Sequence, residues 1–336
     1  MSHDARSLAR ALGAYAVPDS RRSVIELAIS LAGLAACMGA GFAALPRTPL
    51  VAFAVSPIAA GFLCRLFIVF HDCGHHAYFR SRRANDAVGR ALGVLLLTPY
   101  AFWRHSHAIH HGTHGDLGRR GVGDIETLTA AEYQALSRGK QLLYRLYRHP
   151  LVLFGLGGLY QFVLRHRLPY ALPEPRGPML RSILWNDFFL MHAFGAVVLL
   201  GGFGALFWIW LLPILGMAGI AIWVFFVHHQ FETTLWSPPS RWRFEEAALR
   251  GSSFYDLPWL LDWFTGHIGI HHVHHLCPRI PGYRLPAVLR DHPELAGVNR
   301  IGLRESLSCA RLALWDEERE RLLSFREGRG GHHAHR

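Results

Sequence analysis

The chain has 336 residues, of which 51% are hydrophobic and only 18% are charged. Soluble domains carry roughly 25% charged residues, so this composition excludes an ordinary soluble protein and indicates a membrane protein. The formal net charge of +11 does not indicate a nucleic-acid partner, because the sequence has no basic helix and no known nucleic-acid-binding module; arginines that face anionic membrane lipid explain it better.

The N-terminal segment, residues 1–23, carries arginines but no short apolar core with a small-residue cleavage site. We therefore expect a cytosolic segment and not a signal peptide. The five cysteines form no CxxC pair, which argues against a disulfide framework and against an iron–sulfur site.

Four stretches are apolar and near the roughly 20 residues that a bilayer crossing requires. They are residues 24–45, 50–70, 183–200 and 205–227. The turns within the first two and within the last two are very short, so each pair is expected to form a helical hairpin. The segments outside the hairpins, residues 71–182 and 228–326, then lie on the same side as the N-terminus. These regions hold nearly every arginine, so the positive-inside rule places them in the cytosol.

The fold class that follows is an all-α membrane protein, with two transmembrane hairpins and a cytosolic helical cap, in a single domain of residues 24–326. Arg65 lies near the end of the second span, where its guanidinium is expected to reach the membrane surface. Residues 87–102 contain Pro99 and predict an interfacial helix. Residues 151–164 are too short to span and predict a re-entrant or surface segment. The polar tail, residues 327–336, is expected to be disordered.

The 23 histidines of the chain gather in three clusters on the predicted cytosolic side. Positions i, i+3 and i+4 share one face of a helix, so each cluster is expected to direct two or three imidazoles toward one point. A lone histidine at a membrane boundary is usually a polar anchor, but three clusters in helical phase predict metal ligands. The clusters are His71 and His75; His107, His110 and His111; and His271, His274 and His275.

These eight histidines, with His229 after the fourth span as a ninth, exceed the roughly six donors that one transition metal accepts, so the sequence predicts two metal ions. Imidazole suits iron, copper, zinc and nickel alike. Zinc is redox-inert and serves hydrolysis or structure, whereas oxidation of an alkyl chain requires oxygen activation on iron. A site beneath apolar helices suits a lipid substrate, so this chemistry favours di-iron oxidation over zinc hydrolysis.

The three boxes, "HDCGH", "HAIHH" and "HHVHH", resemble those of the membrane-bound fatty acid desaturases. The flanking segments "RRGVGDIETLT", "HHQFETTLW", "GSSFYDLPWLLDWFTGHIGIHHVHHL" and "RIPGYRL" are similar to those of bacterial acyl-lipid desaturases and their plant omega-6 relatives. The resemblance covers about residues 23–325. It implies a di-iron centre, held by the eight box histidines and His229, that uses O₂ and two electrons to remove two vicinal hydrogens from a fatty acyl chain.

The resemblance also implies partners and a location. The chain has no haem-domain signature and no ferredoxin-like cysteine set, so the electrons are expected from a separate ferredoxin or flavoprotein. The acyl chain is linked to lipid, CoA or carrier protein, and the sequence leaves this choice open. We expect the protein in the bacterial cytoplasmic membrane, with its active site on the cytosolic side.

Several residues around the boxes are candidates for supporting roles. His267 stands where relatives tend to have Asn, four residues before His271, so it is expected to face the irons if one helix carries both. His228 stands where Gln is expected, and drift, hydrogen bonding to a ligand or a changed ligand set all remain open. Asp72 could orient an imidazole. The other candidates are His76, beside the first box, and Asp187, near the start of the third span.

Three other functions compete with desaturation. A hydroxylase or ketolase on the same scaffold would act on a lipid or a carotenoid. A metal transporter would need ligands within its spans, where His192 is the exception to a pattern of histidines outside them. A di-haem carrier would need paired histidines inside a four-helix bundle, and the sequence lacks that pattern.

Overall fold

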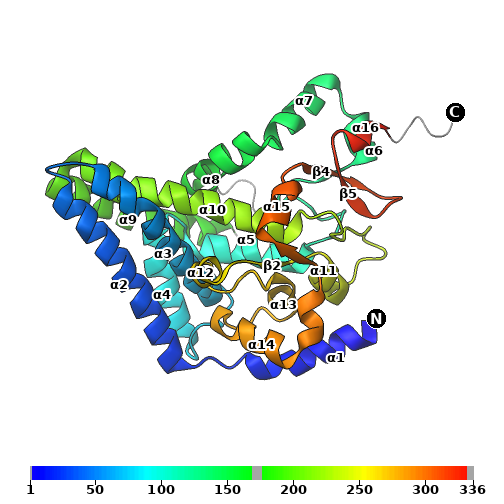
Figure 1. Ribbon diagram of the computed structural model, residues 1–336, viewed down its shortest axis with the longest axis horizontal. Coiled ribbons are helices and arrows are strands. Elements are labelled where there is room, and N and C mark those ends of the chain that lie inside the picture. Colours follow the sequence, from blue (N-terminus) through cyan, green and yellow to red (C-terminus); the bar gives the residue numbers. More distant parts are fainter. Residues whose placement is uncertain (1, 169–175, 331–336) are drawn as a thin grey trace.

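The structure is a computed structural model that describes residues 2–168 and 176–330. Long apolar helices gather at one end of the molecule, and short helices and strands gather at the other (Figure 1). Three helical stretches are long and apolar enough to cross a membrane: Ser20–Ala44, Leu50–Gly74 and Arg176–His229. By length and composition, these stretches indicate a membrane-associated, mostly helical protein.

The first two stretches, α2 (Ser20–Ala44) and α3 (Leu50–Gly74), follow each other after a short turn and pack together. Asp19 caps α2, because its carboxylate accepts the backbone N–H groups of Arg21 and Arg22 at 3.0 and 3.1 Å. Most of α2 is exposed, whereas much of α3 is buried between its neighbours. The central helix α3 therefore carries the first histidine box at its buried C-terminal end.

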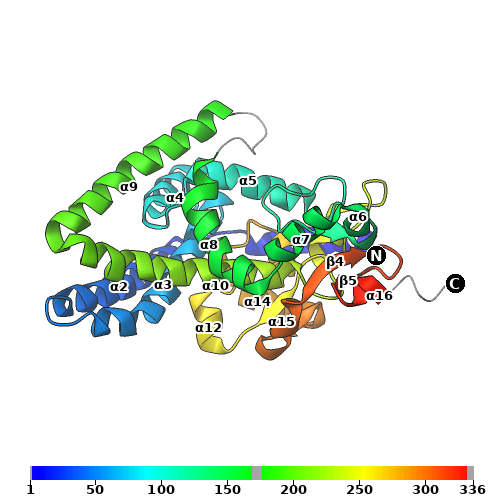
Figure 2. The ribbon, with the colours of Figure 1, turned by 90° about the horizontal axis from the view of Figure 1, so that it is seen from above.

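The third stretch contains α9 (Arg176–Ala205), the π-helical η6 (Leu206–Leu211) and α10 (Leu212–His229). At Gly202 the backbone leaves the helical region with a φ of 72°, which glycine adopts without a Cβ clash. Figure 2 shows α9 and α10 meeting at one end and diverging from there. The stretch therefore holds two helices, and the second ends with His228 and His229.

The Arg65 guanidinium has partners inside the protein, whereas the sequence predicted that it would extend to the membrane surface. Its side chain is buried, pairs with Glu26 of α2 and donates to the Trp263 carbonyl. Its guanidinium also lies over the Trp263 ring, 4.0 Å from the ring centroid. A carboxylate, a carbonyl oxygen and an aromatic face thus contact the guanidinium inside the protein, while its Nε has no hydrogen-bond partner among the described residues.

The interfacial helix predicted over residues 87–102 is instead divided between α4 (Arg82–Leu95) and α5 (Tyr100–Thr113). Proline at position 99 has no N–H and precedes the new helix, consistent with a break at this point. The second helix, α5, carries the second histidine box. It is followed by β1 (Leu128–Thr129), α6 (Ala130–Ala135) and α7 (Arg138–Tyr147).

Residues 151–167 form a helical segment in which π-helical turns alternate with other turns. Its parts are η2 (Leu151–Leu156), α8 (Gly157–Leu159), η3 (Tyr160–Leu164) and η4 (Arg165–Arg167). Gly158 lies against α10 so closely that an added Cβ would be 2.9 Å from the Ala218 carbonyl carbon. A small residue at this contact allows the segment to pack directly on α10.

Short elements from the N-terminus and from the C-terminal third surround the histidine-bearing ends of these helices. The third histidine box is on α13, which packs against α11, and α1 also contacts α11. The elements are α1 (Ser2–Leu12), η1 (Gly13–Tyr15), α11 (Phe244–Arg250), α12 (Trp259–Phe264), α13 (His271–Leu276), η7 (Gly282–Arg284), α14 (Leu285–Asp291), η8 (Pro293–Gly297), α15 (Leu303–Cys309) and α16 (Glu327–Gly330).

Two small sheets depart from the predicted all-α fold. In one, β1 pairs in parallel with β4 (Leu312–Asp316), which pairs antiparallel with β5 (Arg321–Ser324). In the other, β2 (Phe254–Asp256) pairs in parallel with β3 (Arg300–Gly302). Strands this short carry too little period-2 alternation to be recognised in a sequence. The predicted disordered tail begins instead with α16, and residues 331–336 lie outside the described residues.

Candidate metal centre

The nine histidines predicted as ligands lie together in two groups where α3, α5, α10 and α13 converge. Within each group, the candidate ligand nitrogens all lie within 4.8 Å of one another. The five-histidine group consists of His71, His75, His107, His111 and His274, and the four-histidine group consists of His110, His229, His271 and His275.

Each HxxHH motif contributes to both groups, which corrects the expectation that each cluster addresses one point. On α5, His107 and His111 belong to the five-histidine group, and His110 belongs to the other. On α13 the division is reversed, with His271 and His275 in the four-histidine group and His274 in the five-histidine group. Residues four apart differ by about 40° around a helix and stay together, while the residue between them points to the neighbouring group.

Ring nitrogens within the groups approach one another at hydrogen-bonding distance. The Nε2 atom of His107 lies 3.0 Å from His75 Nε2 and 3.1 Å from His111 Nε2. A further contact of 3.1 Å joins His111 Nε2 to His274 Nε2. A neutral imidazole has one N–H, so these converging nitrogens cannot all pair as donor and acceptor. The arrangement suits lone pairs that share a bound cation.

Burial keeps these rings in the protonation state that a metal requires. It lowers the pKa values of His75, His107 and His111 well below the usual range, and neighbouring imidazoles lower them further. The same causes lower the pKa values of His274 and His275. The rings are therefore neutral at physiological pH, and no proton has to leave before they bind a metal.

One carboxylate holds a histidine in each group. Asp72 Oδ1 lies 3.0 Å from His71 Nδ1, and its Oδ2 accepts the Gly282 N–H at 2.7 Å. Asp124 Oδ1 lies 2.5 Å from His110 Nδ1. Both contacts place a proton on Nδ1 and leave Nε2 as the metal-facing lone pair. Within the described residues, His71 Nε2 and His110 Nε2 are buried without a hydrogen-bond partner, so the donor set fits two imidazole-bound metals.

Asp124 and His114 contact histidines of the four-histidine group, although the sequence did not predict a supporting role for either residue. His114 Nε2 lies 3.1 Å from His229 Nδ1 and 2.7 Å from the Gly251 carbonyl oxygen. Together with His110 and Asp124, His114 makes a third cluster of potential ligands. Asp124 is in the quoted segment "RRGVGDIETLT", but it lies in a loop, where no helical spacing relates it to His110.

The other candidates for supporting roles differ in position. The His228 ring stacks on the His271 ring with centroids 3.8 Å apart and planes 18° apart, so it touches a candidate ligand. His76 turns away and pairs with Asp86 at 3.0 Å. Asp187 pairs with Arg167 at 3.2 Å and belongs to neither histidine group.

His267 does not share a helix face with His271, because α13 begins only at His271. It sits in a turn with a φ of 62°, and its Nδ1 lies 2.6 Å from Asp262 Oδ2. It is a member of neither histidine group. Asn and His are both enriched in this left-handed conformation, so the Asn that the resemblance leads us to expect at position 267 would keep the same backbone.

Replacing His267 with Asn is therefore expected to leave metal content and product formation within about twofold of the parent, because Asn adopts the same backbone conformation at low cost. Metal analysis and mass spectrometry of the product check this. A tenfold loss of either, or a changed product, would show that the imidazole itself is required.

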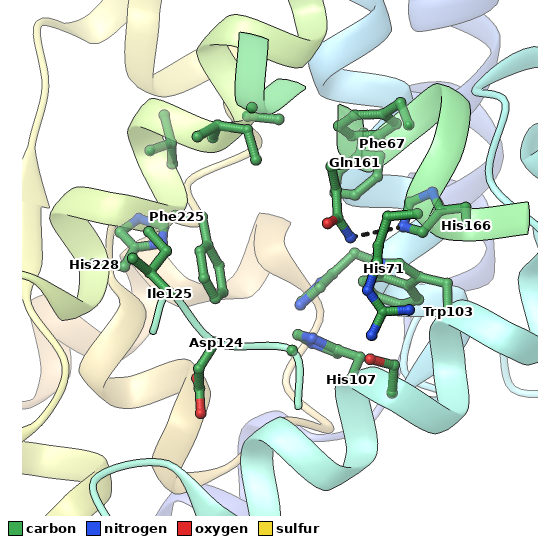
Figure 3. Close-up of a pocket in the computed structure, with 18 of the residues that line it drawn as sticks. Phe67, His71, Trp103, His107, Asp124, Ile125, Gln161, His166, Phe225 and His228 are labelled. Atoms are coloured by element: carbon green, nitrogen blue, oxygen red, sulfur yellow. Dashed lines mark hydrogen bonds between the residues drawn. The ribbon is translucent and has the colours of Figure 1, made fainter. Parts of the chain in front are cut away.

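A cavity of about 320 Å³ opens beside the two groups and includes His71, His107 and His271 in its lining. Figure 3 shows Phe67 and Trp103 on one side of this cavity and Phe225 and Ile125 on the other. Trp103 stacks on His107 with ring centroids 4.4 Å apart. The cavity is mostly apolar, so an alkyl chain fits next to the histidines.

Comparison with known proteins gives a consistent result. The family model described as fatty acid desaturase matches residues 47–306. A fatty acid desaturase of Bacillus subtilis is 39% identical over 331 residues, which is 97% of this chain and 92% of the relative. An sn-1 oleoyl-lipid 12-desaturase of Synechocystis is 29% identical over 220 residues, covering 65% of this chain and 62% of the relative. The chain therefore belongs to the fatty acid desaturase family, and it is an oxidoreductase that desaturates fatty acyl chains.

Proposed function

We propose that the nine histidines bind two iron ions, one in the five-histidine group and one in the four-histidine group. The observation that carries this proposal is the division of the nine residues into two buried groups of convergent nitrogens. Five or four imidazoles stay within the donor number of one transition metal, and a single site for all nine would exceed it. When bound, iron supplies the oxygen activation that breaks strong C–H bonds.

The residues around the groups have defined tasks in this proposal. Asp72 and Asp124 hold His71 and His110 in the tautomer that offers Nε2. The apolar walls of the cavity, including Phe67 and Phe225, exclude water. They also hold the alkyl chain in one position, so the two neighbouring carbons that lie beside the metals are the ones that lose hydrogen. Each double bond formed consumes one O₂, two electrons and two protons and yields two water molecules.

We further propose one catalytic domain over residues 24–326, with four spans in two hairpins. The break at Gly202 supports this, because it interrupts the third apolar stretch near the C-terminal end of α9, and η6 and α10 follow it. The arginine distribution supports a cytosolic position for the histidine centre. In a bacterial cell this corresponds to the cytoplasmic membrane.

A cysteine introduced at Arg138, an exposed position at the start of α7, is expected to escape a membrane-impermeant maleimide in intact cells and to react after lysis. A cysteine at Arg47, in the turn between α2 and α3, is expected to react in intact cells. Labelling measured by a gel shift checks both positions against the parent chain. Efficient labelling at position 138 from outside would contradict the cytosolic cap.

The substrate that fits this site is a fatty acyl chain linked to lipid, CoA or carrier protein. Electrons would come from a separate donor, such as a ferredoxin or a flavoprotein reductase. Ferredoxin appears in the name of one relative, the temperature-sensitive sn-2 acyl-lipid omega-3 desaturase (ferredoxin) of Arabidopsis thaliana. That protein is 27% identical over 243 residues, which cover 66% of this chain and 51% of the relative. A hydroxylase or ketolase on the same scaffold would differ from a desaturase in its product.

Expression in a bacterium that makes no such unsaturated product, together with a ferredoxin and its reductase, tests the proposal. The expected result is a new cis-unsaturated fatty acid, located by mass spectrometry of its derivatised double bond, that disappears without O₂. A hydroxylated or keto product would favour the alternative, and an unchanged acyl profile with metal-loaded protein would contradict both.

A further inference from the structure

A polar cluster in the cavity wall takes no part in the histidine groups. Gln161, Arg165 and His166 line the same cavity as His71 and His107. The Nε2 atom of Gln161 lies 3.1 Å from His166 Nε2. Figure 3 shows this pair beside Phe67, across the cavity from Phe225. Removal of hydrogens from an alkyl chain needs no such polar groups, so the cluster requires another explanation.

The irregular winding of this segment accounts for the pairing. In an α-helix, residues five apart differ by about 140° around the axis and do not meet. Here Gln161 lies in the π-helical η3 (Tyr160–Leu164) and His166 lies in the 3₁₀-helical η4 (Arg165–Arg167), so the departure from regular α-helical winding lets the two side chains meet. Short π-helical turns of this kind are frequent at functional sites.

The cluster offers hydrogen-bond donors. Burial, and then the charges of Arg167 and Arg165, lower the pKa of His166 to about 3, so its ring is neutral. His166 Nε2 accepts from the Gln161 amide, which places the ring proton on Nδ1. His166 is 2% exposed, and a backbone hydrogen bond to Leu97 opposes the fall in its pKa. The ring is therefore held in place between Gln161 and the Leu97 backbone.

We infer that Gln161, Arg165 and His166 bind the acyl carbonyl end of the substrate, while the alkyl chain extends along the apolar walls past the histidine groups. The second amide N–H of Gln161 and the Arg165 guanidinium are the donors for the carbonyl oxygen, and His166 holds the Gln161 amide in place. This inference rests on the proposed function. It adds that the position of the double bond is counted from the carbonyl end, because the cluster and the histidines are both fixed to the fold.

Photolabelling tests the binding site without requiring turnover. The probe is a 16-carbon acyl chain with a diazirine at carbon 2, used as a phosphatidylglycerol ester, as a CoA thioester and as a carrier-protein thioester. A second probe carries the diazirine at the methyl end. We expect the carbon-2 probe to label residues 160–166 in at least one form, and the methyl-end probe to label other residues. The form that labels identifies the carbonyl source. Labelling of this segment only by the methyl-end probe, or by neither probe, would overturn the inference.

Variants of Gln161 and His166 test whether the cluster sets the position of the double bond. Gln161→Leu and His166→Phe are expected to raise the substrate KM about fivefold to tenfold, as loss of one or two hydrogen bonds implies. They are also expected to spread the product over neighbouring double-bond positions. The matched controls Gln134→Leu and His192→Phe change residues outside the cavity lining. They should keep the KM and the double-bond position of the parent protein. Unchanged regioselectivity and KM in both cavity variants, with normal metal content, would contradict the inference.

Discussion

Alanine in place of His274 or His110 is expected to reduce product formation by more than about a hundredfold, a larger loss than the 10–100-fold typical of residues that only support a ligand. His274 belongs to the five-histidine group and His110 to the four-histidine group. Each substitution removes one donor from a buried cluster in which the remaining rings are fixed by helices and cannot move to replace it. Each variant should therefore lose metal from its own group while the protein stays in the membrane.

The measurement is metal content per chain together with product formation in purified variants. His192→Ala is the matched control, because His192 lies on α9, is exposed, and hydrogen-bonds only the Phe188 carbonyl among the described residues. It should retain both metal and activity. Undiminished product in either His274→Ala or His110→Ala would refute the assignment of that residue as a ligand.

The second large effect is expected for Asp124→Asn. Asp124 Oδ1 lies 2.5 Å from His110 Nδ1. Its negative charge makes the His110 Nε2 atom a stronger electron-pair donor to a metal. Asn keeps the size but removes the charge, so metal affinity in the four-histidine group and activity should each fall about 10–100-fold.

A chelator challenge measures this effect, because weaker binding appears as faster metal loss at a fixed chelator concentration. Asp86→Asn is the matched control. Asp86 also contacts a histidine, His76, at 3.0 Å, but that histidine is in neither group, so its metal retention should be unchanged. Equal retention in Asp124→Asn and the parent would mean that the carboxylate does not support the metal.

The sequence predicted the apolar helices well, because bilayer-length hydrophobic runs have few alternative structures. The predicted spans 24–45 and 50–70 correspond to α2 and α3 within a few residues. The surroundings of the Arg65 side chain on α3 were not predicted. Arg65 pairs with Glu26 across the hairpin, and a partner 39 residues away cannot be read from local pattern.

The histidines were found from their helical spacing, yet their grouping was not. Spacing alone indicates which residues share a face, but whether one face meets one metal or two depends on how α5 and α13 pack. Asp124 and the Gln161–His166 pair were not predicted for related reasons, since Asp124 lies in a loop and the pair joins a π-helical turn to a 3₁₀ turn. His267 was misplaced because the start of α13 at His271 was not evident from the sequence.

Metal analysis of the purified parent chain, produced with iron available, tests the central claim most directly. The account predicts about two irons per chain, because nine imidazoles in two groups exceed the donor number of one metal, and it predicts that the same preparation desaturates an acyl chain when O₂ and an electron donor are supplied. Stoichiometric zinc with no iron in that preparation would contradict it.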